Sequence, residues 1–339
     1  MTRHESTPLV AGVDAGGSKT IAWIDHPRPF RPQSDDRTTD LVRPLAEGIG
    51  GTGNPRVGGY EAAANEIEYA VRQALSTPNV TTESATTRLT RVCVGAAGAG
   101  RREEQKHLAA ILSKRFPGTA IIVTDDAVPV LAAASPTATG MILISGTGSF
   151  AWARNSSGAD ARAGGWGVVI GDPGSGYALA IAGLDAVARA VDGRGPETTL
   201  LTSFCNRFAV KDPMRLIDHV YAPSMTRREI AKQSRLVIAA AETGDSVARE
   251  IVESAAEELA RHVRTLARRL NLSAGITLAL SGGVLVNEPL LREQLLERID
   301  CLQLQTRLVD APVAGALVLA NRPDLIEILQ NRLVSATSM

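Results

Sequence analysis

Three stretches of this chain share one arrangement, in which an apolar run stops at a turn that contains glycine. They are "VDAGGSKT", "ISGTGS" and "LSGGVL", which begin at Val13, Ile144 and Leu280. In the first two stretches a second apolar run follows the turn, which is typical of a β-hairpin. Alternating strand and helix patterns follow each hairpin. This order of elements predicts an α/β architecture that is present twice in the chain.

The length and charge of the chain limit what it can be. Its 339 residues are enough for two domains, and an apolar content of 44% is enough for a buried core. Because 36 Lys and Arg residues balance 36 Asp and Glu residues, charge gives no argument for nucleic acid or an anionic membrane as a partner.

The cysteines and the apolar runs bear on the compartment. Cys93, Cys205 and Cys301 are too few and too far apart for a disulfide framework or a zinc or iron–sulfur site. Segment 1–8 is polar, unlike a signal peptide, and no apolar run approaches the length of a membrane span. We therefore expect a cytoplasmic protein.

The first turn, Gly16–Thr20, looks like a P-loop but has the wrong spacing. A P-loop needs glycine directly before lysine and a helix behind it, whereas Ser18 precedes Lys19 and a β-like run follows. The N–H groups of a glycine-rich hairpin turn can still bind phosphate. Asp14 would then act through Mg²⁺ or its waters. A purely structural hairpin explains this stretch equally well.

The second and third turns offer similar groups. Gly146, Thr147 and Gly148 lie between two apolar runs and could donate N–H groups and a hydroxyl to a polyphosphate. Gly282 and Gly283 would let a base or ribose lie against the backbone. Each turn alone is as well explained by a structural role. Their occurrence together favours one nucleotide held by both halves of the chain.

Carboxylates occupy two informative places. Asp125 and Asp126 follow a buried strand, and ligands of α/β sheets bind at the carboxyl ends of strands. Either could be the base of a phosphoryl transfer or cap the helix expected over 127–134; we expect one to do each. Asp172 precedes a helix that begins near Ser175, so it could hold sugar hydroxyls or cap that helix.

Several other patterns in the sequence favour a structural role. The run "GAAGAG" has the wrong order for a dinucleotide-binding fingerprint, and the five histidines form no metal or triad pattern. The glycine-rich segment 48–59 predicts a shaped loop, and the Pro- and Arg-rich segment 26–43 predicts a loop or ragged edge. Further helices are expected over 60–75, 103–116 and 249–270.

Taken in order, these motifs resemble those of the N-acetylglucosamine kinases and their bacterial relatives, the BadF/BadG-type ATPase family. The stretches that carry the resemblance are "GVDAGGSKT", "GAAGAG", "VTDDA", "LISGTGSFAWA", "GDPGSGY", "AVDGRGPETTL" and "LSGGVLVN". The family belongs to the superfamily of actin, hexokinase and the heat-shock chaperones. The resemblance therefore implies two ribonuclease-H-like (actin-like ATPase) domains with ATP in an interdomain cleft. We expect them over 1–136 and 137–322, with a C-terminal helix at about 323–339 returning to the first.

The resemblance also implies a role for each motif residue. The residues implied to bind ATP are Gly16, Gly17, Ser18, Lys19, Thr20, Gly146, Thr147, Gly148, Gly282 and Gly283. The residues implied to bind the sugar are Asn54, Gly165, Trp166 and Asp172. Asp14 is implied to lie near Mg²⁺. Asp126, which precedes a small residue and a helix, fits the catalytic base better than Asp125, the second choice.

The chain departs from the family at one informative position. Pro173 stands where kinase members often carry glutamate near the sugar, so the substrate preference stays open. The scattered cysteines do not supply the iron–sulfur ligands of the activator ATPases. The Cys-rich zinc motif of the other bacterial sugar kinase family is missing too.

These observations predict an ATP- and Mg²⁺-dependent kinase that phosphorylates an amino sugar, at the 6-hydroxyl of N-acetylglucosamine or glucosamine. A homodimer is expected from the family. Two alternatives remain: an ATPase module that couples hydrolysis to a protein partner, and a sugar-binding sensor without catalysis.

Overall fold

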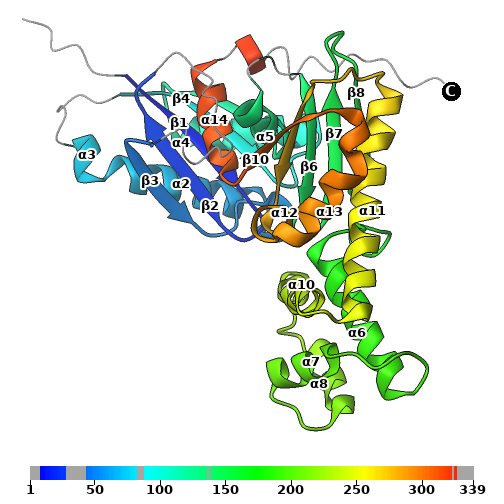
Figure 1. Ribbon diagram of the computed structural model, residues 1–339. Coiled ribbons are helices and arrows are strands. Elements are labelled where there is room, and N and C mark those ends of the chain that lie inside the picture. The colour runs from blue at the N-terminus through cyan, green and yellow to red at the C-terminus, as the bar shows by residue number, and fades with distance from the viewer. Residues whose placement is uncertain are drawn as a thin grey trace, which may run out of the picture. The chain divides into compact units, whose positions relative to one another are not determined.

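The computed structural model describes residues 8–27, 43–81, 88–135, 137, 139–322 and 324–326. These residues form two compact units (Figure 1). Unit 1 draws on Met1–Gly140, Ser156–Ala159 and Arg307–Met339, and unit 2 on Met141–Asn155 and Asp160–Thr306. The boundary expected at residue 136 stays a prediction. The Pro- and Arg-rich segment 26–43 and the helix expected at about 323–339 lie mostly outside the described residues.

Unit 1 is built on a five-stranded sheet in the order β3-β2-β1-β4-β5. Its strands are β1 (Pro8–Ala15), β2 (Thr20–Asp25), β3 (Ala46–Gly50), β4 (Arg88–Ala96) and β5 (Ala120–Asp125). Strands β1, β2 and β3 pair antiparallel, which confirms the expected hairpin at the first turn. Strands β1, β4 and β5 pair parallel, so their carboxyl ends meet at one edge of the sheet.

Helices cover this sheet, and side chains of β1 alternate between its faces. Leu9, Ala11 and Val13 join the core beneath helices α2 (Tyr60–Leu75) and α4 (Arg102–Arg115). Gly12, between Ala11 and Val13, faces the other side of the sheet. There it lies so close to the backbone of α14 (Pro312–Asn321) that a Cβ has no room. Helix α14 also packs on α5 (Ala127–Ala134), and Figure 1 shows it, in red, along β1.

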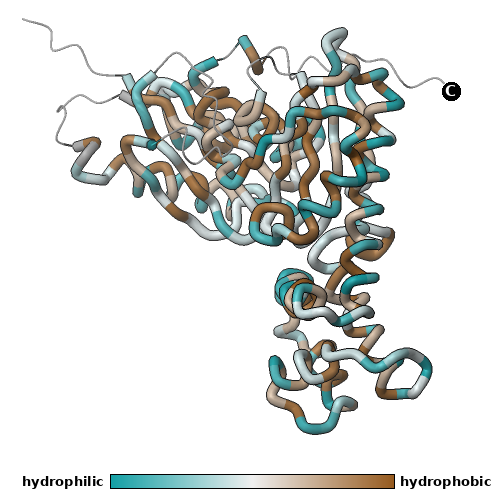
Figure 2. Tube along the Cα trace, viewed as in Figure 1, coloured by the Kyte–Doolittle hydropathy of each residue, from teal (hydrophilic) through white to brown (hydrophobic). Residues whose placement is uncertain are grey.

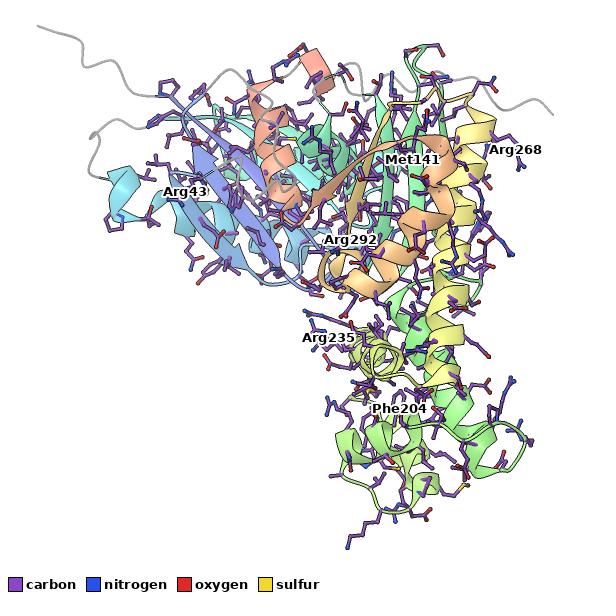
Figure 3. All side chains as sticks on the ribbon, in the orientation of Figure 1. Arg43, Met141, Phe204, Arg235, Arg268 and Arg292 are labelled. Carbon is purple, nitrogen blue, oxygen red and sulfur yellow. The ribbon has the colours of Figure 1, made fainter. Side chains whose placement is uncertain are left out.

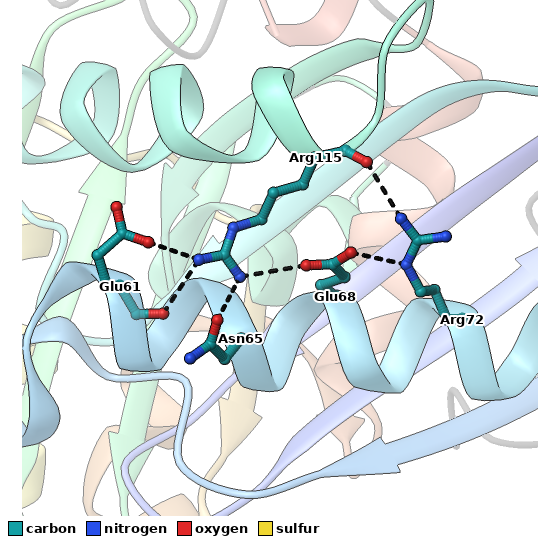
Figure 4. A network of polar contacts seen from close by, with 5 residues as sticks. All are labelled: Glu61, Asn65, Glu68, Arg72 and Arg115. Atoms are coloured by element: carbon teal, nitrogen blue, oxygen red, sulfur yellow. Dashed lines mark hydrogen bonds and ion pairs between the residues drawn. The ribbon is translucent and has the colours of Figure 1, made fainter.

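A polar network joins α2 to α4 on the outside of unit 1 (Figure 4). Arg115, at the end of α4, pairs with Glu61 and Glu68 of α2 and donates to the amide oxygen of Asn65. Arg72 then pairs with Glu68 and donates to the carbonyl of Arg115. One half-buried guanidinium thus fixes the spacing of two helices that cover the sheet.

The loop expected over 48–59 is wrong in part, since residues 46–50 form strand β3. Gly48 and Gly50 face the carbonyls of Ala70 and Glu66 on α2, and neither position has room for a Cβ. The glycines therefore allow close helix–sheet packing and do not mark a turn. The remainder, residues 51–59, is loop apart from one short helix, α1 (Pro55–Gly58), which follows Asn54.

A second five-stranded sheet, in the order β10-β9-β6-β7-β8, belongs mostly to unit 2, although the last residues of β10 are assigned to unit 1. Its strands are β6 (Gly140–Ser145), β7 (Ser149–Arg154), β8 (Asp160–Gly164), β9 (Thr277–Ser281) and β10 (Gln305–Val309). Strands β7 and β8 pair antiparallel and β6 pairs parallel with β9. Two mixed α/β units with one such sheet each confirm the predicted architecture.

The 24-residue helix α11 (Ser246–Arg269) is the longest among the described residues. It packs on β7, β8 and α13 (Pro289–Ile299) with its apolar stripe, seen as alternating brown and teal in Figure 2. Helix α6 (Gly176–Val191) begins at the expected place, because Ser175 caps it by accepting the N–H of Ala178.

The sequence made no prediction for most of 192–245, which forms further helices. They are α7 (Leu200–Phe208), α8 (Leu216–Val220), α9 (Arg227–Lys232) and α10 (Ser234–Glu242). Phe204, labelled in Figure 3, is fully buried among them. Two more short α-helices are α3 (Pro78–Thr81) and α12 (Gly283–Asn287), and two single 3-10 turns are η1 (Pro213–Arg215) and η2 (Asp300–Leu302). No helix within the described ranges is long and apolar enough to cross a membrane.

Candidate active site

The first glycine turn closes the β1–β2 hairpin with Ala15 paired to Thr20. The N–H of Gly16 donates to the carbonyl of Lys19 at 3.0 Å, while Gly17, Ser18 and Lys19 are exposed. Thr20 is buried and its hydroxyl donates to the carbonyl of Gly51. The exposed part of the turn therefore offers backbone and side-chain donors to an anion, whereas the Thr20 hydroxyl proton is already in use.

The loop that follows β3 lies directly against this turn. The N–H of Gly53 donates to the carbonyl of Gly16 at 3.0 Å, and the Thr52 hydroxyl lies 3.4 Å from the same oxygen. Asn54 caps α1 with its side-chain oxygen, which accepts the N–H of Arg56. Its amide nitrogen is turned toward Gly17, 3.9 Å from where a Cβ would lie. Asn54 can thus donate to a ligand beside the turn.

Asp14 ends β1 next to the same turn. Burial raises the pKa of its carboxyl to about 6, and the positive charge of Lys19 opposes that rise. Within the described residues, no three His, Cys, Asp or Glu side chains gather as a metal cluster. A single carboxylate suits Mg²⁺, which keeps several waters and takes other ligands from phosphates. The chemistry of this donor set therefore fits the expected ion.

The two adjacent carboxylates at the end of β5 differ in their surroundings. Asp125 is buried, and its Oδ1 accepts the N–H groups of Ala127 and Val128 at 3.1 Å each, so it caps α5. Asp126 is half-buried and its side chain makes no cap bond to that helix. Capping therefore falls to Asp125. The role of Asp126 as base stays a prediction.

Strand register brings these carboxylates to the edge that carries Asp14. Ala15 pairs with Ala96 of β4, and Ala96 pairs with Asp125 of β5. Two strand spacings, about 10 Å in all, separate Asp125 from the end of β1. Unit 1 thus gathers the first phosphate turn, Asp14, Asn54 and the Asp125–Asp126 pair at one edge of its sheet.

In unit 2, the glycine turn at 146–148 lies against the one at 282–283. Gly146 donates to the carbonyl of Gly148 at 2.9 Å, and Thr147 is exposed at the tip. A Cβ on Gly146 would lie 3.6 Å from the N–H nitrogen of Gly283. Gly282 has a φ of +91° and its Cα faces the backbone of Ser145, so only glycine fits there. Unit 2 therefore brings the two expected nucleotide turns together.

The segment 164–176, which contains the expected sugar contacts Gly165, Trp166 and Asp172, is hydrogen-bonded to the second turn. Ser149 accepts the N–H of Gly165 at 3.0 Å and donates its hydroxyl to the carbonyl of Pro173 at 2.7 Å. The Ser145 hydroxyl donates to the carbonyl of Gly174 at 2.7 Å. The sequence missed the role of both serine hydroxyls, since nothing local signals bonds across more than 20 residues.

Asp172 and Trp166 occupy different environments within this segment. Asp172 is buried, its Oδ1 accepts the N–H of Gly167 at 3.0 Å, and its Oδ2 faces Gly148. It therefore braces its own loop against the second turn and does not cap α6, which Ser175 caps. Trp166 is 72% exposed, so its ring is available to a ligand.

Side chains of β7, β8 and α11 also contact the start of this segment. Arg162 lies over the ring of Phe150 and donates to the carbonyls of Gly164 and Gly165. The ring of His262 on α11 lies against Gly164. Burial lowers the pKa of His262, opposed by Glu258 and Asp172, so the ring is mainly neutral at pH 7 and packs without a charge.

Residues 11–320 match the BadF/BadG/BcrA/BcrD ATPase family. The chain belongs to this family.

Two curated relatives are similar over most of this chain. An N-acetylmuramic acid/N-acetylglucosamine kinase of Clostridium acetobutylicum is 32% identical over 279 residues, which cover 82% of this chain and 86% of the relative. An N-acetyl-D-glucosamine kinase of Dictyostelium discoideum is 27% identical, covering 87% and 91%.

A solved structure has a similar fold. It is that of a protein from Chromobacterium violaceum provisionally named an N-acetylglucosamine kinase, with a TM-score of 0.71. The two chains are 24% identical over 92% of this chain and 98% of that one. The predicted fold class is therefore confirmed.

Proposed function

We propose that this protein is an ATP-dependent kinase that transfers the γ-phosphate of ATP to a hydroxyl of an amino sugar. The observation that carries the proposal is the similarity to the Clostridium kinase across 82% of the chain. The clustering of the motif residues within each unit supports it. The acceptor we favour is the 6-hydroxyl of N-acetylglucosamine or glucosamine.

The proposed mechanism gives each group one task. Asp126 accepts or orients the proton of the sugar hydroxyl. The glycine turns at 16–20 and 146–148 donate N–H groups to the charge that spreads over the transferring phosphoryl group. Mg²⁺, held through Asp14 and water, would neutralise charge on the β- and γ-phosphates. Gly282 and Gly283 would lie against the adenosine. The expected homodimer and cytoplasmic setting stay predictions.

The test is ADP release measured across a panel of acceptors. The panel holds N-acetylglucosamine, glucosamine, N-acetylmuramic acid and glucose, and the phosphorylated position is read from the product by NMR. We expect sugar-dependent ADP release with the phosphate on the 6-oxygen. ATP hydrolysis at one rate with and without sugar would instead indicate an ATPase module. Sugar binding in calorimetry without any sugar phosphate would indicate a sensor.

A further inference from the structure

An arginine lies beside the residue proposed to bind the sugar in unit 1. Arg56 is two residues after Asn54, and its N–H donates to the Asn54 side-chain oxygen at 2.8 Å. A Cβ on Gly98 would meet the Asn54 amide and lie 3.2 Å from Cγ of Arg56, so all three residues pack together. The Arg56 side chain therefore begins beside the residue that is proposed to hold the sugar.

Two hydrogen bonds fix the direction of this guanidinium. Its Nε donates to the carbonyl of Gly98 at 3.1 Å, and its Nη2 pairs with Glu104 Oε1 at 3.0 Å. Nη1 takes part in neither bond, and 61% of the side chain is exposed. The charge is thus oriented before any ligand arrives, while one edge of the guanidinium still faces water. Such preorganisation reduces the entropy lost when a ligand binds.

The local charge favours an anion. Arg101 and Arg102 join Arg56 around the first turn of the 14-residue helix α4, against Glu103 and Glu104. Three positive charges therefore face two negative ones at the positive end of a helix dipole. Burial opposes ionisation of Glu104, but the Arg101 N–H and the Arg56 guanidinium together lower its pKa. Glu104 stays charged and competes for Arg56.

We propose that Arg56 binds a carboxylate carried by the sugar and so selects acidic amino sugars as acceptors. This inference rests on the proposed kinase function and adds the chemical class of the substituent. Guanidinium and carboxylate make charge-assisted hydrogen bonds, which are stronger than neutral ones. An ether-linked carboxylic acid on the sugar ring supplies such a group without using the hydroxyl that is phosphorylated.

The competing explanation is that Arg56 only joins the Asn54 loop to α4 as a structural brace. The two explanations differ in sign for one substitution. Glu104→Gln removes the carboxylate that competes for Arg56, yet its amide oxygen can still accept the Arg101 N–H that caps α4. Selection by Arg56 predicts better use of an acidic sugar by this variant. If Arg56 is only a brace, Arg56→Gln and Glu104→Gln should lower kcat/KM by the same factor.

The experiment measures kcat/KM for N-acetylmuramic acid and N-acetylglucosamine with the full-length protein. We expect Arg56→Gln to lower the acidic-to-neutral ratio of kcat/KM by about 10- to 100-fold, which is the range for a hydrogen bond to a charged group. Glu104→Gln should raise that ratio about two- to five-fold, since it frees a charge-assisted donor. Lys114→Gln, which removes an exposed positive charge in the last turn of α4, is the matched control and should leave the ratio nearly constant.

Each other outcome counts against the inference. Equal losses for both sugars in Arg56→Gln and Glu104→Gln, with unchanged circular dichroism, would assign Arg56 to bracing alone. If the wild type phosphorylates N-acetylglucosamine but never N-acetylmuramic acid, the inference fails while the kinase function stands. If it phosphorylates no sugar, the proposed function fails and takes the inference with it.

Discussion

Asp125 and Asp126 are neighbours in the chain, but their hydrogen bonds give them different work. The Asp125 carboxylate is committed to two N–H groups of α5. We expect Asp126→Asn to lower kcat about 10²- to 10⁴-fold, because a general base contributes that much in the transition state. The sugar KM should change far less, since proton transfer is an interaction of the transition state. Steady-state kinetics on the best acceptor check this.

Asp125→Asn is the matched control for that substitution. Asparagine caps helices about as well as aspartate, so this variant should keep its fold and most of its turnover. If Asp125→Asn abolishes activity while Asp126→Asn stays near the wild-type rate, the two roles are exchanged.

Asp14 links the proposed metal site to stability. Its pKa is about 6 in the folded protein against 3.8 ordinarily, because burial disfavours the charged form. The neutral carboxyl therefore contributes stability below about pH 4, and that stability is lost as the pH rises through 6. Asp14→Asn stays neutral throughout. At pH 8 we expect its free energy of unfolding to exceed that of the wild type by up to about 3 kcal/mol. Its melting temperature at pH 8 should therefore be higher.

The measurement is thermal unfolding of both proteins without nucleotide or Mg²⁺, at pH 4 and pH 8. The advantage of Asp14→Asn should vanish at pH 4, where both proteins carry a neutral group. Its activity should be lost at either pH, since the amide does not replace the carboxylate near Mg²⁺. A melting difference that is the same at both pH values would show that burial of the Asp14 charge is not the cause.

At the scale of single residues, the sequence predicted the residues that belong to motifs but not those that support them. The Asp125–Asp126 pair follows a buried strand, which is a local and readable signal. Arg56 has no such signal, because its partners Gly98 and Glu104 lie more than 40 residues away. Long-range hydrogen bonds leave no periodicity in the chain, and so Arg56 could be found only in the folded structure.

At the scale of elements, the second phosphate turn and the segment 164–176 are held to each other by hydrogen bonds. Ser149 contributes one bond through its carbonyl and one through its hydroxyl, and Gly176 donates to the carbonyl of Gly146 at 2.8 Å. A ligand that orders one of these segments therefore orders the other. In the proposed kinase, nucleotide and sugar should consequently strengthen each other's binding.

Ser149→Ala tests this coupling, because it removes the bond to Pro173 and leaves that carbonyl without its donor. We expect the factor by which a non-hydrolysable ATP analogue tightens sugar binding to fall about three- to ten-fold, which corresponds to a loss of roughly 1 kcal/mol. Calorimetry of sugar binding with and without the analogue measures the factor, and the reverse titration must give the same value.

Ser203→Ala is the control, since the Ser203 hydroxyl donates to the carbonyl of Thr199, which directly precedes α7. It should leave the coupling factor unchanged. If Ser149→Ala weakens each ligand separately but keeps their mutual effect, the hydrogen bonds hold the loop without linking the two ligands.

Elements were predicted well wherever their signal was local. Helix α2 begins and ends at the expected residues 60 and 75, and α5 at 127 and 134. Strand β3 was missed because glycines that permit close packing look like turn glycines in the sequence. The difference depends on where α2 lies, and only tertiary structure supplies that.

For the molecule as a whole, the important feature is that unit 1 is discontinuous in the sequence. Its first part runs to Gly140, a short piece follows at Ser156–Ala159, and its last part begins at Arg307. Helix α14, from the second part, covers β1 at Gly12 and packs at Gly315 on the carbonyl of Pro129 in α5. Residues on all sides of α5 are buried. Without α14, one face of the unit 1 sheet and much of α5 would be exposed to water.

We therefore expect a fragment of residues 1–140 to aggregate or remain unfolded, because burial of that apolar face supplies stability that a small unit cannot spare. A fragment of 141–309 keeps every strand of the unit 2 sheet except the first residue of β6, and it should melt cooperatively. Circular dichroism and thermal unfolding of each fragment measure this. Co-expression of 1–140 with 305–339 should restore soluble 1–140, since it returns α14. A soluble, cooperatively melting 1–140 fragment would contradict the argument, because it would show that the sheet of unit 1 is stable with its α14 face uncovered.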